Sequence, residues 1–435
     1  MNKYKDQIVA VIGFGIEGKD AIKYLLEAGA LVTLFDKKEE SELDFSDVDK
    51  TKIKLVCGEN YLNDGIVDFD YIVRSPGVYP YTRELVDAKN SGSLITSAVK
   101  IFFDECQGKI IGVTGTKGKG TTSTLIYEIL KADGRDVYLS GNIGKPYLEL
   151  LPKLNENSLV VMEMSSFQLI DMRVSPHISV VLNITEDHMD WHKDREEYLD
   201  AKRNIVRFQK QNDFAVINEE YETPKSFATN TIGQVIFFSK QKLEQKYKEE
   251  LLLRGEHNLE NIAAAVATVK CIGISNDKIL KTVQSFKGLE HRLELAGEIN
   301  GVKFYNDSFA TGPQPTIAAI NSFTEPETII LGGSDKGLDY KELGEVISKK
   351  ENIKHIILIG ETKLKIENSL NIANCKLEII KLEKTDMTKI VKIAHQITEP
   401  GGVVILSPAS ASFDMFKNYK DRGNQFKEAV VSLKQ

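Results

Sequence analysis

Short apolar runs alternate with amphipathic stretches along most of this 435-residue chain. The first apolar run covers residues 7–15, an amphipathic stretch follows at 18–29, and a second apolar run covers residues 31–36. Apolar residues that recur every three to four positions predict a helix, and short continuous apolar runs predict buried strands. This order predicts a strand–helix–strand unit whose two strands lie parallel in one sheet.

The same alternation returns twice further along the chain. A strand at 109–115 leads into a helix at 121–134, and a long alanine-rich helix is expected at 258–273. An Asn-Gly pair at 300–301 predicts a hairpin. Three later apolar runs, each ending in glycine or small polar residues, predict another parallel sheet, at 327–335, 353–361 and 401–410.

The pattern therefore predicts an α/β protein of three domains. We expect a Rossmann-like N-terminal domain over residues 1–93. A central P-loop type mononucleotide-binding α/β domain is expected over 94–295, and a C-terminal Rossmann-like α/β domain over 296–435.

Charge and hydropathy exclude some classes of partner. The formal net charge is −7, whereas a nucleic-acid-binding protein needs a basic face. No apolar run is long enough to predict a membrane span, and the N-terminus leads into a strand without the apolar stretch of a signal peptide. We expect a cytoplasmic enzyme with neither nucleic acid nor membrane as a partner.

The first glycine-rich turn contains Gly13, Gly15 and Gly18, between a predicted strand and a predicted helix. With Asp36 at the end of the next strand, this context fits a dinucleotide fingerprint. The residues alone leave NAD or FAD binding and a purely structural turn both open. Lys37 and Lys38 would meet phosphate or uridine oxygens, or would belong to a solvated run of charges.

The second glycine-rich turn, residues 115–122, reads Gly-Thr-Lys-Gly-Lys-Gly-Thr-Thr. It is a shortened relative of the P-loop, in which backbone N–H groups at a helix start form an anion-binding nest. We expect Lys119 to reach the terminal phosphates. Gly120 stands where the P-loop has a hydroxyl residue, so Thr121 is the nearest hydroxyl for Mg²⁺.

Three further residues are candidates for the chemistry. Glu163 ends an apolar strand, where an unpaired charge would be costly, and a carboxylate there suits Mg²⁺. His188 closely follows another strand and should lie on the same sheet edge, although a lone histidine can be structural. Lys202, by pattern alone, is an ordinary surface lysine.

Many ordered motifs together resemble the Mur ligase family over nearly the whole chain. They include GVTGTKGKGTT, GNIG, MEMSSFQL, NITEDHMDWH, GLEHRLE, YNDS, LGGSDKG and SPASASFDMFKNYKDRGNQF. The resemblance implies that the first turn holds the UDP of a sugar-peptide precursor and that the second holds ATP. It also implies that the third domain supplies the amino-acid site and closes over the other two. The implied reaction adds glutamate, the D form by expectation, to UDP-N-acetylmuramoyl-L-alanine through an acyl phosphate.

The resemblance also assigns roles to single positions. It implies that ATP is bound by Gly115, Thr116, Lys117, Gly118, Lys119, Gly120, Thr121, Asn261, Arg292 and Asp307. It implies that the UDP substrate is bound by Ile16, Glu17, Lys37, Lys38, Gly77, Asn142 and His188. Glutamate would be held by Thr311, Lys336, Ser412, Phe413 and Tyr419. The catalytic residues would be Lys119, Glu163, His188 and Lys202. Two Mg²⁺ ions would be held by Thr121, Glu163, His188 and a carbamate on Lys202. The protein is expected to act as a monomer.

Three positions depart from the family pattern. Phe309 stands where the family often has lysine, Tyr419 replaces a common phenylalanine, and Gly120 replaces a common serine or threonine. The missing lysine leaves the amino acid, and the D or L form of glutamate, less defined than the ligase chemistry.

Other functions stay open on the sequence. A related amide ligase would add a different amino acid or L-glutamate, or glutamate to folate. An NAD-dependent oxidoreductase would explain the first turn but would leave the second turn, Glu163 and His188 without a role. A nucleotide sensor without catalysis would leave the metal and lysine positions unexplained.

Overall fold

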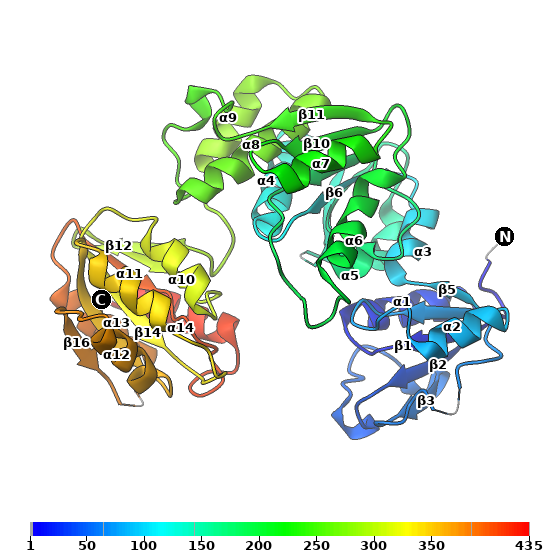
Figure 1. Ribbon diagram of the computed structural model, residues 1–435, viewed down its shortest axis with the longest axis horizontal. Helices are drawn as coiled ribbons and strands as arrows, with labels where there is room; N and C mark the ends of the chain where they lie inside the picture. The colour runs from blue at the N-terminus through cyan, green and yellow to red at the C-terminus, as the bar shows by residue number, and fades with distance from the viewer. Residues whose placement is uncertain (1–2, 64, 143, 384, 435) are drawn as a thin grey trace. The chain divides into compact units, whose positions relative to one another are not determined.

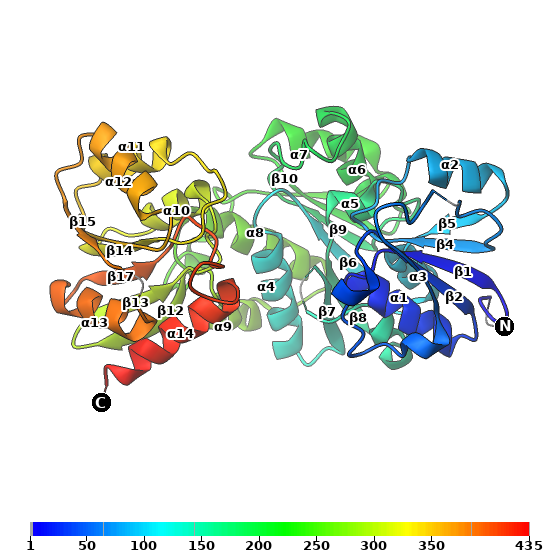
Figure 2. The same cartoon turned by 90° about the horizontal axis from the view of Figure 1, so that it is seen from below.

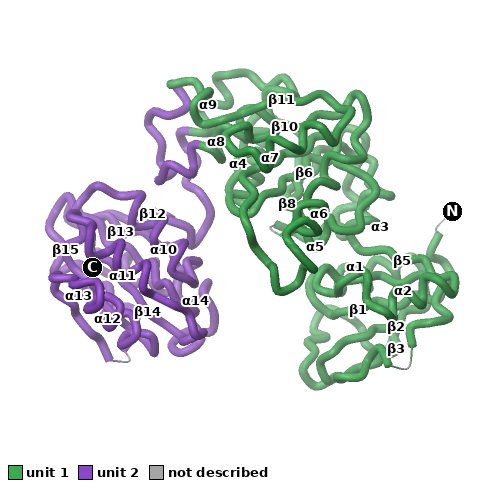
Figure 3. Tube along the Cα trace, in the orientation of Figure 1, with its two compact units in different colours: residues 1–245, 260–283 green, residues 246–259, 284–435 purple. Residues whose placement is uncertain are grey.

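The computed structural model describes residues 3–63, 65–142, 144–383 and 385–434. These residues form three separate β-sheets, each combined with helices (Figures 1 and 2). The chain divides into two compact units, residues 1–245 with 260–283 and residues 246–259 with 284–435 (Figure 3). Each unit is described by itself. In the described part of the chain, every helix is too short or too polar to be a membrane span.

The first sheet contains five parallel strands in the order β3-β2-β1-β4-β5, the strand order of a Rossmann fold without its sixth strand. Its strands are β1 Ile8–Ile12, β2 Leu31–Asp36, β3 Lys54–Cys57, β4 Tyr71–Arg74 and β5 Leu94–Thr96, and its helices are α1 Ile16–Glu27, α2 Arg83–Asn90 and α3 Ala98–Glu105. Strand β5 lies beyond the expected domain end at residue 93, because Leu94 pairs with Tyr71 at the sheet edge.

The second sheet contains six parallel strands in the order β11-β10-β9-β6-β8-β7. Its strands are β6 Lys109–Thr114, β7 Val137–Gly141, β8 Leu159–Glu163, β9 Ile178–Val181, β10 Phe214–Asn218 and β11 Gln234–Phe238. The helices of this region are α4 Lys119–Ala132, α5 Ser166–Leu169, α6 Arg195–Arg207, α7 Glu222–Ser226, α8 Glu256–Cys271 and α9 Asn276–Ser285. Strands β8 and β9 flank β6, so the segments that follow these three strands meet at one edge of the sheet.

The third sheet has the order β12-β13-β17-β14-β15-β16 and is parallel except for the antiparallel pair β12 and β13. Its strands are β12 Glu294–Ile299, β13 Val302–Asn306, β14 Glu327–Gly332, β15 Ile353–Ile359, β16 Glu378–Lys381 and β17 Val403–Leu406. Its helices are α10 Pro313–Ile320, α11 Lys341–Lys349, α12 Lys363–Ile372, α13 Met387–Ile397 and α14 Tyr419–Ser432. Asn300 and Gly301 both have positive φ, which confirms the predicted Asn-Gly hairpin.

The apolar run of β14 shows why this sheet is buried on both faces. Ile330 packs in a cluster with α13 and α14, whereas Ile329 and Leu331 pack in another with α11 and α12. Because side chains alternate along a strand, a continuous apolar run supplies both faces of a doubly covered sheet. The doubly wound α/β architecture predicted from the sequence is confirmed in all three sheets. The boundaries between the domains stay predictions.

Candidate active site

The second glycine-rich turn joins β6 to α4. Gly118 precedes the first residue of α4 and has φ of 85°, a conformation that favours glycine. A Cβ atom at Gly118 would lie 2.2 Å from Oδ1 of Asn261. Within the described residues, no side chain caps this end of α4. The backbone N–H groups at such a helix start form an anion site, so the turn fits a nucleotide phosphate.

Lys119 lies folded over this turn. Its Nζ donates hydrogen bonds to the carbonyl oxygens of Gly115 at 3.1 Å and Thr116 at 3.0 Å. Lys117 is exposed, whereas Thr121 is half-buried in the first turn of α4. The turn therefore combines backbone donors, an ammonium group and a hydroxyl within seven residues.

The prediction from the sequence pattern that Lys202 is an ordinary surface lysine is wrong, because this residue of α6 is buried. Its side chain is almost completely buried, with 2% of the residue exposed. Its Nζ donates to the carbonyl oxygen of Gly115 at 3.0 Å, and lies 4.9 Å from the centre of the Tyr198 ring. Burial, together with repulsion from Lys119, lowers the pKa of Lys202 well below its ordinary value. Lys202 thus lies next to the second glycine-rich turn, where burial favours the uncharged form of its amine.

A sequence signal for this burial exists. The side chains of Tyr198, Leu199, Ala201 and Ile205 on α6 are buried, and Lys202 lies one helical turn from Tyr198. A lysine inside the apolar stripe of a helix is therefore a candidate for a buried amine.

Glu163 is the last residue of β8, and its register places it beside Val113 of β6 and Gly141 of β7. The carboxylate therefore leaves the sheet at the edge where the phosphate turn begins. The N–H of Asn142 donates to the carbonyl oxygen of Glu163 at 3.4 Å. The hydroxyl of Thr121 and the carboxylate of Glu163 are oxygen donors, the ligand type that Mg²⁺ prefers. Among the described residues, no three His, Cys, Asp or Glu side chains gather closely enough to hold a metal by themselves.

His188 follows β9 and has φ of 55°, which is uncommon for a non-glycine residue. Its ring packs on Phe167 with 4.7 Å between ring centres, and its Nε2 lies 3.5 Å from Asp187. Such backbone strain occurs preferentially at functional sites. Nearby, Nε2 of the buried His192 lies 2.9 Å from the Ser166 hydroxyl, a contact that the sequence did not indicate.

The acidic side chains at the first glycine-rich turn accept hydrogen bonds from other groups of the protein. The Asp36 carboxylate accepts the N–H of Phe14 at 2.6 Å and that of Lys38 at 2.9 Å. The Glu17 carboxylate accepts a 2.6 Å hydrogen bond from Nε2 of the buried Gln168. Asp36 occupies the position of the acid that binds the ribose in a dinucleotide site, and its carboxylate is thus already bound to backbone N–H groups.

The other candidates for the UDP substrate are more open to solvent. Ile16 is 77% exposed. Lys37, Lys38, Gly77 and Asn142 are also exposed, and the carbonyl oxygen of Gly77 accepts a 3.0 Å hydrogen bond from the Trp191 indole.

All the remaining candidates except Asn261 belong to the second compact unit. Asp307 is buried, its carboxylate accepts the Ser407 hydroxyl at 2.7 Å, and burial raises its pKa to about 7. Lys336 lies 5.6 Å from the centre of the exposed Phe413 ring, while Ser412 is buried. Arg292 is exposed beside Phe309. Asn261 belongs to the first unit, where its Oδ1 accepts the Thr122 hydroxyl at 3.2 Å.

These features define a three-domain α/β protein whose central sheet carries a glycine-rich turn with the backbone form of an anion-binding site. Three family models match it in order: Mur ligase MurD-like, N-terminal domain at residues 7–97, Mur ligase middle domain at 113–250, and Mur ligase, glutamate ligase domain at 291–410. The chain belongs to the Mur ligase family.

Relatives of full length support the same grouping. A UDP-N-acetylmuramoylalanine--D-glutamate ligase of Acetivibrio thermocellus is 42% identical, over 99% of this chain and 97% of the relative. A protein of the same name from Clostridium botulinum strain 657 is 40% identical, over 99% of each chain.

Two solved structures share the fold. MurC of Thermotoga maritima matches with a TM-score of 0.61 at 18% identity, over 98% of this chain and 100% of its own. MurF of Thermotoga maritima, solved in complex with ADP, matches with a TM-score of 0.57 at 19% identity, over 100% and 97%. At this identity the likeness shows the fold alone.

Proposed function

We propose that this protein joins D-glutamate to UDP-N-acetylmuramoyl-L-alanine in an ATP-dependent reaction of cytoplasmic peptidoglycan precursor synthesis. The full-length relatives that carry this activity in their names support the substrate pair. The observation that carries the chemistry is the buried Lys202 amine against the carbonyl oxygen of Gly115, directly below the phosphate turn. A sensor or an oxidoreductase needs no such amine there.

The reaction has two steps that balance. A substrate carboxylate oxygen attacks the γ-phosphorus of ATP, and ADP leaves, which gives an acyl phosphate. The amine of D-glutamate then attacks the acyl carbon, loses a proton, and expels inorganic phosphate as the amide forms. Because phosphoryl transfer depends mainly on positioning and electrostatic stabilisation, the protein's contribution is placed charge.

The phosphate turn supplies most of that charge. The backbone N–H groups after Gly118 would bind the phosphate oxygens, and Lys119 would swing from the carbonyls of Gly115 and Thr116 to the outer phosphates. Asn261, next to Gly118, would contact the adenine. Arg292 and Asp307 are proposed for the phosphate and the ribose.

Two Mg²⁺ ions are proposed for this region. Thr121, Glu163, His188 and a modified Lys202 would hold them. Bound Mg²⁺ would neutralise the charge that develops on the transferred phosphate.

The Lys202 environment supports a carbamate. An uncharged amine attacks CO₂ and loses a proton, and burial already favours the uncharged form of Lys202. The resulting anion would turn its repulsion with Lys119 into attraction. The buried amine would thereby become an oxygen donor for a metal ion.

The substrate ends are assigned to different sheets. The UDP moiety would lie at the first turn, along the exposed Ile16, Lys37, Lys38 and Gly77, with Asn142 and His188 toward the muramoyl part. Glu17 would act through its backbone, since Gln168 holds its carboxylate. Glutamate would be held by Thr311, Lys336, Ser412, Phe413 and Tyr419, where a lysine can pair with its carboxylates. The protein would act as a monomer.

Phosphate release with UDP-N-acetylmuramoyl-L-alanine, ATP and each glutamate enantiomer tests this proposal. We expect release that requires all three compounds and occurs with D-glutamate. Release with L-glutamate only would refute the stereochemistry. Release without any amino acid would refute the ligase, and a change in nicotinamide absorbance would favour the oxidoreductase.

A further inference from the structure

The carboxylate of Glu17 points from the first glycine-rich turn toward the helix that follows β8. Glu17 is the second residue of α1. Its carboxylate accepts a 2.6 Å hydrogen bond from Nε2 of the buried Gln168, which belongs to α5. Both residues lie in the first compact unit. This hydrogen bond therefore links the first turn to the central sheet within one unit.

The amide of Gln168 has a fixed orientation. Its Oε1 accepts the N–H of Ser165 at 2.8 Å and the Ser165 hydroxyl at 3.1 Å, which closes a capping box at the start of α5. Because these donors occupy Oε1, Nε2 is the end that needs an acceptor, and Glu17 supplies it. Ser165 follows Glu163, the last residue of β8, by two positions. The Glu17 carboxylate is thus linked through one side chain to the end of β8.

Glu17 also faces the segment that follows β7. Burial raises the pKa of Glu17, and the Tyr147 hydroxyl and Gln168 lower it in part, so the carboxylate lies close to both side chains. Tyr147 is itself buried. One turn further along α1, the Asp20 carboxylate accepts the N–H of Leu148 at 2.9 Å. The start of α1 is therefore bound to the segments that follow both β7 and β8.

A second contact holds the same region without Glu17. Arg74, the last residue of β4, is buried, and its Nη2 donates to the Asp171 carboxylate at 2.7 Å and to the carbonyl oxygen of Phe167 at 3.2 Å. This ion pair also joins the first sheet to α5 and the residues after it. Loss of the Glu17 carboxylate should therefore change the spacing at the first turn and leave the protein folded.

This spacing matters for a ligand that spans both regions. In the proposed function, UDP lies at the first turn, whereas Asn142 after β7 and His188 after β9 lie toward the muramoyl part. A ligand with two linked parts binds tightly only where both parts reach their sites at once, and a small misplacement removes much of the gain. UDP alone needs only the first turn.

We propose that Glu17 is a positioning residue, which holds the first glycine-rich turn at a fixed spacing from the ends of β7 and β8 so that one UDP-sugar-peptide molecule contacts both regions. This inference rests on the proposed function, which places UDP at the first turn. It gives the Glu17 carboxylate a role beyond the backbone contact proposed for this residue.

Two dissociation constants test the proposal, one for UDP and one for UDP-N-acetylmuramoyl-L-alanine, both measured by calorimetry on the full chain. We expect Glu17→Leu to weaken binding of the complete substrate about tenfold, the size of a lost hydrogen bond to a charged group. Binding of UDP should change by less than about twofold. A merely structural role would leave the ratio of the two constants as it is in the wild type.

Two conservative variants separate the reach of the side chain from its charge. Glu17→Gln keeps an acceptor oxygen at the same distance and should keep the wild-type ratio. Glu17→Asp keeps the charge but is one methylene too short for Gln168, so it should behave as Glu17→Leu does. If Glu17→Leu does not fold, Glu17→Asp decides the question.

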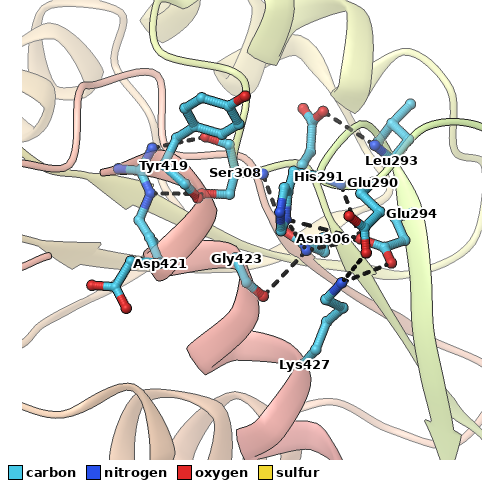
Figure 4. Close-up of polar contacts among 12 residues, drawn as sticks. Glu290, His291, Leu293, Glu294, Asn306, Ser308, Tyr419, Asp421, Gly423 and Lys427 are labelled. Atoms are coloured by element: carbon cyan, nitrogen blue, oxygen red, sulfur yellow. Dashed lines mark hydrogen bonds and ion pairs between the residues drawn. The ribbon is translucent and has the colours of Figure 1, made fainter. Parts of the chain in front are cut away.

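Glu294→Leu is the matched control. The Glu294 carboxylate accepts a 3.1 Å hydrogen bond from Nδ2 of the buried Asn306, a carboxylate–amide pair of the same kind in the second unit (Figure 4). Glu294→Leu should leave both dissociation constants unchanged, because no part of the UDP substrate is proposed to bind there.

An unchanged ratio in both Glu17→Leu and Glu17→Asp would overturn the proposal, as would a loss of UDP binding equal to the loss of substrate binding. In either case, wild-type turnover with D-glutamate would leave the proposed function standing. A wild-type chain that binds the complete substrate no more tightly than UDP would refute the proposed placement of the substrate, and this inference with it.

Discussion

The two glycine-rich turns of the first compact unit share a backbone design but differ in charge. Each follows a parallel strand and leads into a helix, and each contains a glycine with positive φ, Gly13 and Gly118. A Cβ atom at Gly18 would lie 1.9 Å from the Gly13 carbonyl oxygen, and one at Gly118 would lie 2.2 Å from Asn261. Both turns therefore require glycine for close approach of backbone.

Their side chains act in opposite ways. Around the first turn, the carboxylates of Asp36 and Glu17 accept hydrogen bonds from Phe14 and Gln168. Around the second turn, Lys119 covers the carbonyls and Lys202 lies buried beneath them. Glycines thus create the shape of an anion site, and the charge around it selects the ligand. Under the proposed function, the second turn would bind ATP and the first would bind the UDP substrate.

The strongest test of this difference removes the cation of the second turn. Lys119→Ala should lower ATP-dependent phosphate release by about a thousandfold or more, because placed charge carries most of the catalysis. Binding of the UDP substrate, measured by calorimetry, should stay within about twofold of wild type. Lys131→Ala, on the same helix, is the control. Equal losses of turnover and UDP-substrate binding would contradict the division between the turns.

Removal of the buried amine should have the next largest effect. Lys202→Ala should lower turnover about a hundredfold, the upper end of the loss that follows when groups around a metal site are changed, because under the proposed function it removes the carbamate. Formate or acetate should restore part of the rate, since a short carboxylate can occupy the place of the carbamate. Lys119→Ala should not respond to these anions. If neither anion restores activity and depletion of CO₂ leaves the turnover of the wild type unchanged, the proposal that Lys202 carries a carbamate is refuted.

Alanine substitutions at one glycine of each turn test whether the backbone there requires glycine. Gly118→Ala should lower the free energy of unfolding by about 1–2 kcal/mol and weaken ATP binding, because φ is positive and Asn261 blocks a Cβ atom. Gly15→Ala should lower it by less, about 0.5 kcal/mol, because Gly15 has φ of −74° and a Cβ atom there meets open space, which leaves only the cost of alanine at the N-cap of α1. Denaturant unfolding measures the free energy of unfolding of both variants, and calorimetry measures their ATP binding. Unchanged stability and ATP binding in Gly118→Ala would show that glycine is not required at position 118.

The smallest effect concerns Asp20, on the helix after the first turn. Its carboxylate accepts the N–H groups of Leu148 at 2.9 Å and Glu149 at 3.2 Å, and burial raises its pKa from 3.8 to about 6. The folded state therefore binds this proton more tightly than the unfolded state does, so stability falls as pH rises from 3.8 to about 6.

Asp20→Asn keeps an acceptor oxygen but carries no charge. It should be more stable than wild type by roughly 1–2 kcal/mol at pH 7.5, and this advantage should disappear below about pH 4. Thermal unfolding at several pH values measures the difference. An advantage that does not change with pH would show that Asp20 is not the titrating group.

Much of the fold was predictable because its signals are local. The apolar run at 7–15 contains β1, the Asn300–Gly301 pair forms its hairpin turn, and Glu163 ends β8 at the edge where the phosphate turn begins. Each of these follows from residues that are neighbours in sequence, through side-chain period and turn conformation. The extent of the first sheet was less predictable, since Leu94 joins it by pairing with the distant Tyr71.

The environments of the charged residues were decided by the tertiary structure. The sequence by itself determined three doubly wound sheets, two glycine-rich turns and the order of the candidate residues. Only the packed chain buries Lys202 under Gly115, engages Asp36 with Phe14, and sets Arg292 against Phe309. Burial and charge depend on groups that are distant along the chain, so the pKa of an amine or the direction of a guanidinium exists only once those groups meet.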